Sequence, residues 1–220
     1  MVFPSQTAAH ATGPTPQPSA AATPSQGLTL PPPRPSPLLV ATAGEALFDL
    51  IEEPDGRLRP CAGGAVYNLT RALGLQGVGT LYLNPLSGDL LGRQLAQGLQ
   101  TAQVTLAAPA PVREPSALAL AALDAQGKAS YSFYRDGVAD RAVTAEALNA
   151  ACAAHPGLQV VATGCLALVA QDAAVYQPWL AAQRAAGRMV VVDANLRLSA
   201  VDDAEAYRAN VMAALQHAHL

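Results

Sequence analysis

The chain has 220 residues, enough for one sizeable core, and 51 % of them are hydrophobic against 13 % charged, which indicates a folded rather than a disordered protein. The formal net charge is −3 and no cluster of Lys or Arg occurs, so nucleic-acid binding has no electrostatic support; no apolar run reaches the length of a membrane span. The three cysteines form no CxxC pair, which is typical of reduced thiols and predicts a cytoplasmic protein.

Residues 1–37 differ in composition from everything that follows. They hold ten of the 18 prolines, no acidic residue and a single formal charge, at Arg34. Such a segment cannot bury enough apolar area to offset the entropy of ordering it, so we predict that it is disordered. It also lacks the basic start and apolar block of a secretory signal. We therefore expect the folded domain to span residues 38–220.

The elements predicted after this tail alternate between strands and helices, with two hairpins among them. Strands are expected at 38–42, 46–51, 57–60, 78–83, 104–106, 116–123, 128–134, 159–163 and 188–192, and helices at 65–76, 88–100, 144–154, 171–186 and 203–217. The alternation predicts parallel strands with right-handed crossovers and helices on both faces. The hairpins, around turns at 54–56 and 124–127, fit poorly in such a sheet and are expected to form a lid. The predicted fold class is α/β, a doubly wound, mainly parallel sheet with a small β lid.

The stretch from Gly63 to Asn68 is the first candidate binding site. A ligand can approach the backbone closely at Gly63 and Gly64, and the helix start behind them presents free N–H groups and the positive end of its dipole. Asn68 lies one turn into that helix and can face the same ligand. Asp49 lies within an apolar strand, where a carboxylate is costly unless it is paired or bound to a ligand. These groups predict a site for an oxygen-rich molecule, although a tight turn with a surface Asn explains the glycines equally well.

Two further candidates directly follow expected strands, where open parallel sheets bind their ligands. One is Asp89 with its flanking glycines. The other is the stretch 193–197, in which Asp193, Asn195 and Arg197 alternate and would suit a hydroxylated or phosphorylated ligand. The alternative is that Asp193 and Arg197 pair with each other and cap the last helix.

The sequence lacks the signatures of several enzyme classes. It contains no GxxxxGK[ST], no GxGxxG after a strand, no HExxH and no GxSxG. P-loop phosphoryl transfer, dinucleotide redox chemistry, zinc proteolysis and serine hydrolysis therefore have no support. The four histidines make no metal-ligand pattern with acids or thiols, so no metal site is expected within this sequence.

Four stretches in a fixed order nevertheless resemble a known family. GEALFDL at 44–50, GGAVYN at 63–68, SFYRDGVAD at 132–140 and DANLR at 193–197 are similar to motifs of the PfkB/ribokinase-type carbohydrate kinases, most of all the fructokinase and 2-keto-3-deoxygluconate kinase branch. The resemblance covers about residues 38–220. It implies a ribokinase-like α/β fold with a β-clasp lid, and transfer of the ATP γ-phosphoryl group to a sugar hydroxyl with Mg²⁺. It also implies a possible homodimer through the lid.

The resemblance assigns roles to individual residues. Four of them are expected to hold sugar hydroxyls: Asp49, Gly63, Gly64 and Asn68. Tyr134 and Arg135 on the lid are expected to touch the substrate from above. Asn195 and Arg197 are expected near the transferred phosphate or the far end of the sugar.

The chain also departs from the family pattern. It ends at Leu220, before the Asn-x-x-Glu magnesium motif and the GAGD-type motif that carries the anion hole and the catalytic base. We therefore expect the sugar-binding part of a kinase, with no catalytic residue in this chain, a fold incomplete at its C-terminus and little activity alone. The alternatives are a non-catalytic sugar-binding remnant and an unrelated Rossmann-like nucleotide binder. Fructose is a neutral candidate substrate, whereas two arginines, Arg135 and Arg197, could grip the carboxylate of 2-keto-3-deoxygluconate.

Overall fold

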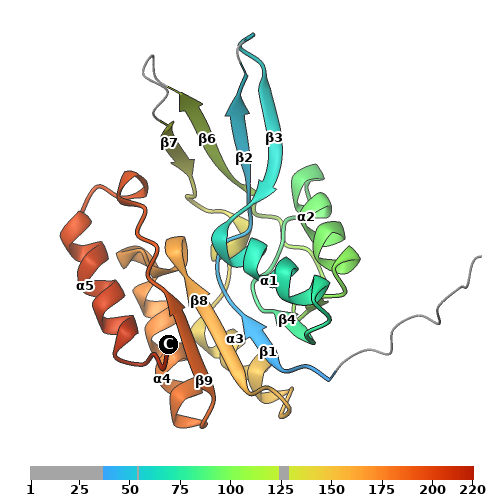
Figure 1. Ribbon diagram of the computed structural model, residues 1–220, viewed down its shortest axis with the longest axis vertical. Coiled ribbons are helices and arrows are strands. Elements are labelled where there is room, and N and C mark those ends of the chain that lie inside the picture. Colours follow the sequence, from blue (N-terminus) through green and yellow to red (C-terminus); the bar gives the residue numbers. More distant parts are fainter. Residues whose placement is uncertain (1–36, 54, 124–128) are drawn as a thin grey trace, which may run out of the picture. The chain divides into compact units, whose positions relative to one another are not determined.

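The structure is a computed structural model that describes residues 37–53, 55–123 and 129–220 (Figure 1). Nearly all of the tail expected at 1–37, and the hairpin turn expected at 124–127, lie outside the described residues. The expected turn at 54–56 is described except for residue 54.

Five parallel strands form the main sheet, in the order β5-β4-β1-β8-β9. Their bounds are Val40–Thr42 (β1), Thr80–Tyr82 (β4), Thr105–Leu106 (β5), Val160–Gly164 (β8) and Met189–Asp193 (β9). Five α-helices are described, at Ala65–Leu75 (α1), Leu90–Thr101 (α2), Ala145–Ala153 (α3), Ala173–Ala185 (α4) and Ala204–Leu215 (α5). The strand–helix alternation of the sequence thus produces the parallel α/β sheet that it predicts.

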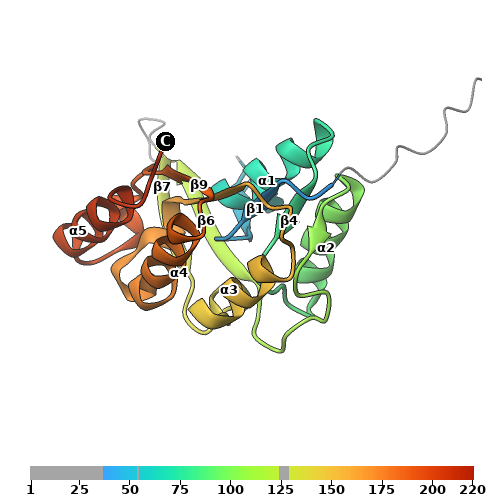
Figure 2. The ribbon, with the colours of Figure 1, turned by 90° about the horizontal axis from the view of Figure 1, so that it is seen from below.

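Helices pack on both faces of this sheet, as expected. Figure 2 shows α1 on one side and α3, α4 and α5 on the other. Leu81 and Tyr82 are consecutive in β4 and fully buried, but they point to opposite faces because the side-chain period of a strand is two. Leu81 packs in the core cluster that includes Trp179 of α4, whereas Tyr82 packs with Tyr67 of α1 and Leu95 of α2. Each such side chain contributes about 1.5–3 kcal/mol of burial free energy.

The two hairpins combine into one four-stranded lid, in the order β3-β2-β6-β7. The strands are Leu47–Glu52 (β2), Leu58–Gly63 (β3), Ala117–Leu123 (β6) and Ala129–Tyr134 (β7). β2 pairs antiparallel with β3, and β6 with β7, while β2 and β6 join the hairpins through a parallel ladder. Figure 1 shows the lid extending beyond one end of the main sheet. A third core cluster, which includes Leu47, Ala117 and Leu166, packs the base of the lid against the segment after β8.

Three helices begin at a side chain that caps their first turn. Asp89 accepts a hydrogen bond from the Gly92 N–H at 2.7 Å, Thr144 from Ala147 at 3.2 Å and Asp203 from Ala206 at 2.8 Å. The candidate site expected around Asp89 is therefore the start of α2. The same carboxylate also accepts from the backbone N–H of Ser116 at 2.8 Å, so it fixes the point where the chain enters the second hairpin.

Candidate functional site

A cavity of about 300 Å³ lies beneath the lid and brings five of the expected site residues together. Asp49, Gly64, Asn68, Asn195 and Arg197 all line it. The remaining lining residues are Glu45, Leu47, Ala65, Tyr131, Phe133, Cys165 and Leu166. β2, α1, β7 and the segments after β8 and β9 thus each contribute a wall.

Asp49 supplies a carboxylate to the upper wall. It lies in β2, half-buried, and burial is the cause that raises the pKa of its carboxyl above the ordinary value of 3.8. Among the residues that the structure describes, the Asp49 carboxylate has no hydrogen-bond or ion-pair partner. Gly63 lies directly under it, because a Cβ at Gly63 would overlap the Asp49 Oδ2 atom. The glycine thus makes room for the carboxylate, which is left free to accept hydrogen bonds from a ligand.

Gly64 turns the chain from β3 into α1. Its φ of +104° lies in the region that favours glycine, and a Cβ there would lie 2.8 Å from the backbone oxygen of Glu45. The turn places Asn68, in the first turn of α1, at the same cavity as Asp49. Gly64 and Asn68 therefore lie at one cavity. Contrary to the expectation from the sequence, the N–H groups of Ala65 and Val66 at the helix start donate to Glu45 and are not free for a ligand.

Glu45 is the functional candidate that the sequence reasoning missed. Its side chain is 1 % exposed, and its Oε1 accepts hydrogen bonds from the backbone N–H groups of Ala65 at 2.7 Å and Val66 at 3.4 Å. Burial raises the pKa of Glu45 to about 7, against the opposing effect of the Arg135 guanidinium. The available signal was an acid between two apolar runs, the same signal that singled out Asp49.

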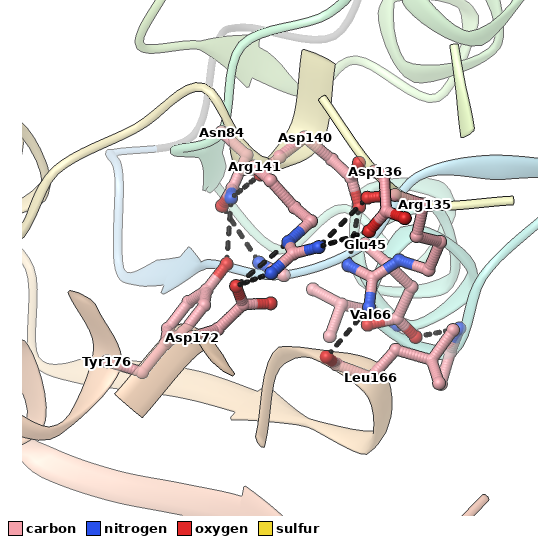
Figure 3. Close-up of polar contacts among 12 residues, drawn as sticks. Glu45, Val66, Asn84, Arg135, Asp136, Asp140, Arg141, Leu166, Asp172 and Tyr176 are labelled. Carbon is pink, nitrogen blue, oxygen red and sulfur yellow. Dashed lines mark hydrogen bonds and ion pairs between the residues drawn. The ribbon is translucent and has the colours of Figure 1, made fainter. Parts of the chain in front are cut away.

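Arg135 is held inside the protein rather than at this cavity. Its guanidinium donates to the Leu166 carbonyl and to Asp140 Oδ2, each at 3.0 Å, and Arg141 binds Asp172 beside it (Figure 3). The Arg135 and Asp140 side chains are only 10 % and 1 % exposed. The structure thus gives Arg135 the surroundings of a buried ion pair at the base of the lid.

Tyr134 also lies away from Asp49. Together with Arg135 it lines a second cavity of about 660 Å³, between the end of β7 and residues 199–202. Alternate residues of a strand share a face, so Tyr131 and Phe133 line the cavity of Asp49 while Tyr134 does not. The rings of Tyr131 and Phe133 stack with their centroids 6.0 Å apart. The aromatic roof over the site therefore consists of Tyr131 and Phe133, which the sequence reasoning did not select.

The segment after β9 closes the far side of the cavity. Arg197 donates to Asn195 Oδ1 at 2.6 Å, and Asp193 accepts from the Asn195 backbone N–H at 3.1 Å. The alternative in which Asp193 pairs with Arg197 and caps the last helix is not what the structure has, since the cap of α5 is Asp203. Arg197 brings one exposed guanidinium to the cavity.

The described residues hold no group of three or more His, Cys, Asp or Glu side chains that could bind a metal ion. In the same part of the chain, every helix is too short or too polar to cross a membrane.

A family model described as "pfkB family carbohydrate kinase" matches residues 38–220, which is most of the chain. The chain belongs to this family. It is 27 % identical over 181 residues to a fructokinase of Rhizobium leguminosarum bv. trifolii. The crystal structure of a fructokinase from Xylella fastidiosa is similar with a TM-score of 0.71 at 26 % identity, over 83 % of this chain. A second structure of the fructokinase from that organism, with bound ATP, gives a TM-score of 0.70 at 26 % identity over 82 % of this chain.

The matches cover only part of these relatives. The chain spans 53 % of the Rhizobium fructokinase and 60 % and 56 % of the two Xylella chains. The family is that of the pfkB carbohydrate kinases, and the fold is the ribokinase-like α/β fold of these structural neighbours.

Proposed function

We propose that this chain is the sugar-binding part of an ATP-dependent kinase that phosphorylates a sugar hydroxyl. One observation carries the proposal: the free carboxylate of Asp49, the Gly64 turn and the Asn68 amide converge on one cavity under an aromatic roof. A carboxylate accepts hydrogen bonds from hydroxyl groups, an amide both accepts from them and donates to them, and aromatic rings can cover the apolar face of a sugar. Membership of the pfkB family supports the same reaction class.

Fructose is the substrate that the site supports best. Arg135 and Arg197 are the arginines that could grip the carboxylate of 2-keto-3-deoxygluconate, but the guanidinium of Arg135 is already engaged by Asp140 and Leu166. Arg197 alone is left at the cavity, and it donates to Asn195. The relatives named fructokinase support a neutral sugar as well.

ATP and Mg²⁺ are the co-substrate and metal ion that this reaction class requires. Asn195 and Arg197 are the residues of this chain that we expect closest to the transferred phosphate, because the family resemblance implies that role and both line the same cavity as Asp49. The described residues offer no carboxylate cluster for Mg²⁺, so we assign none of them to the metal.

The lid also supports the homodimer that the resemblance implies. β3 and β7 are the outer strands of the lid sheet, and Leu58 and Tyr134 on them are 47 % and 58 % exposed. Outer strands with exposed apolar side chains favour pairing with a second copy. Light scattering of the purified chain tests this proposal: a monomer at all concentrations contradicts it.

Calorimetric titration of the purified chain with fructose, with 2-keto-3-deoxygluconate and with ATP tests the proposed function. We expect fructose to bind and Asp49→Asn to raise its dissociation constant at least about ten-fold, because a hydrogen bond to a charged acceptor contributes about 1.5–3 kcal/mol. Asp55→Asn is the matched control, since Asp55 lies in the turn of the same hairpin and pairs with Arg57 at the surface. Equal affinities of the two variants for fructose contradict the role of Asp49, and preferred binding of 2-keto-3-deoxygluconate contradicts the choice of substrate.

A further inference from the structure

Glu45 lies between the end of β1 and the start of β2, in the segment that connects the main sheet to the lid. The chain returns from the first hairpin at Gly64, and there the Glu45 Oε1 atom accepts the N–H groups of Ala65 and Val66. Gly64 is the N-cap of α1 and has no side chain to accept these donors. A carboxyl 20 residues upstream thus takes the place of a local cap.

This arrangement sets α1 apart from α2, α3 and α5, whose own N-cap side chains accept the hydrogen bond. A local cap orients only its own helix. Glu45 also joins α1 to β2, the strand that carries Asp49, so one carboxyl links two walls of the cavity. Two backbone contacts act beside this link: the Glu45 carbonyl accepts from the Tyr67 N–H at 3.2 Å, and the β2–β3 ladder pairs Leu47 with Gly63.

The second carboxyl oxygen of Glu45 is closed to a ligand. Oε2 is buried, with less than 1 Å² accessible and no hydrogen-bond partner among the described residues. A ligand in the cavity therefore does not reach it. Two charged groups at the lid base, Arg135 and Asp140, act on Glu45 (Figure 3). Glu45 acts in turn on titratable groups of β4, the segment after β8 and α5, namely Tyr82, Cys165 and Tyr207.

We propose that Glu45 is a positioning residue of the sugar cavity: it holds the amino end of α1 against the lid strand β2, so that Gly64 and Asn68 face Asp49. As far as the ligand is concerned, this inference rests on the proposed function. The hold on α1 exists without any ligand and can be measured without one.

Three variants of the full chain test the inference. Glu45→Met keeps the size of the side chain but removes the acceptor, Glu45→Asp withdraws the carboxyl by one methylene, and Glu45→Gln keeps an acceptor oxygen. We expect amide hydrogen exchange at Ala65 and Val66, without sugar, to be at least about ten-fold faster in E45M and E45D. We expect the fructose dissociation constant to rise about ten-fold in the same two variants and to stay within about three-fold in E45Q.

Asp203→Ala is the matched control. It removes a carboxylate that caps α5 through the same kind of bond, to the Ala206 N–H at 2.8 Å, and Asp203 does not line the sugar cavity. D203A is expected to accelerate exchange at Ala206 and to leave fructose affinity unchanged. An equal loss of fructose affinity in D203A and E45M overturns the inference, because the loss then follows from weakening any helix.

The remaining outcomes separate the inference from the proposed function. Unchanged exchange at Ala65 and Val66 overturns the inference, whether or not fructose binds; where E45M fails to fold, E45D and E45Q decide. A wild-type chain that binds no fructose overturns the proposed function instead, and the exchange rates alone then decide whether Glu45 holds α1.

Discussion

Replacing Arg135 by Met decides whether this arginine stabilises the fold or binds the substrate. The substitution keeps the length of the aliphatic stem but removes the guanidinium that binds Asp140 Oδ2 and the Leu166 carbonyl. The Asp140 side chain is 1 % exposed, and its Oδ1 already lacks a partner among the described residues. R135M therefore leaves a buried carboxylate with neither of its oxygens bound to a cation.

Breaking a buried ion pair from one side costs about 3–5 kcal/mol, because an uncompensated charge remains inside the protein. We therefore expect R135M to lower the folded-to-unfolded ratio roughly a thousand-fold. This is a large loss, because a small domain has only about 5–15 kcal/mol of stability in total. The double variant R135M/D140L removes both charges and is expected to lose less than R135M alone. Low pH should also restore part of the stability that R135M loses. Burial already raises the pKa of Asp140, and without the guanidinium the carboxyl takes up a proton more readily.

Urea unfolding followed by tryptophan fluorescence measures these losses. Trp179 is the only tryptophan of the chain and is fully buried in α4, so its emission reports on the core. The reasoning is refuted if R135M unfolds within about 1 kcal/mol of the wild type, well below the loss expected for a broken buried pair. An R135M variant of native stability that loses fructose affinity would instead support the substrate contact implied by the family resemblance.

Three further predictions concern the lid base. Stability should fall as pH rises from 4.5 to about 7, by roughly 3 kcal/mol, because folded Glu45 keeps its proton until about pH 7 while the unfolded chain loses it near the ordinary value of 4.5; urea unfolding across this range should show a flatter profile for E45Q. Gly64→Ala should cost about 1–3 kcal/mol and exceed Gly56→Ala in the same assay, since both residues have positive φ but only a Cβ at Gly64 meets other atoms. Asp89→Ala should cost about 1–2 kcal/mol through the lost cap of α2 and leave calorimetric fructose affinity unchanged, whereas weakened binding would restore Asp89 as a site residue.

Most of the fold could be predicted because its signals are local. Apolar runs and helical spacing locate the strands and helices, and the Thr144 cap and the glycine at 187 after α4 mark helix ends within a few residues. The parallel ladder that joins β2 to β6 was not predicted, since it pairs residues such as Leu47 and Ala117 that no local pattern relates. The lid was expected as two hairpins, and only this pairing makes it one sheet.

The candidate site was predictable where one residue type implies one environment. A carboxylate in an apolar strand and a glycine pair before a helix identified Asp49, Gly64 and Asn68 without any knowledge of the surrounding residues. Arg135 was harder, because an arginine at the end of a lid strand fits a substrate contact and a buried ion pair equally well. The partner that settles its surroundings, Asp140, is five residues further on and is buried by contacts that the sequence does not reveal.

Charge balance at the base of the lid explains why the pKa of the Glu45 carboxyl is raised to about 7. Three buried acids, Glu45, Asp140 and Asp172, meet two guanidiniums there (Figure 3). Arg135 pairs with Asp140, and Arg141 pairs with Asp172. Glu45 is left with backbone donors and the more distant charge of Arg135, so desolvation dominates and its pKa rises to about 7. The residue that ties α1 to the lid is therefore also the one whose loss of a proton near neutral pH lowers the stability of the fold.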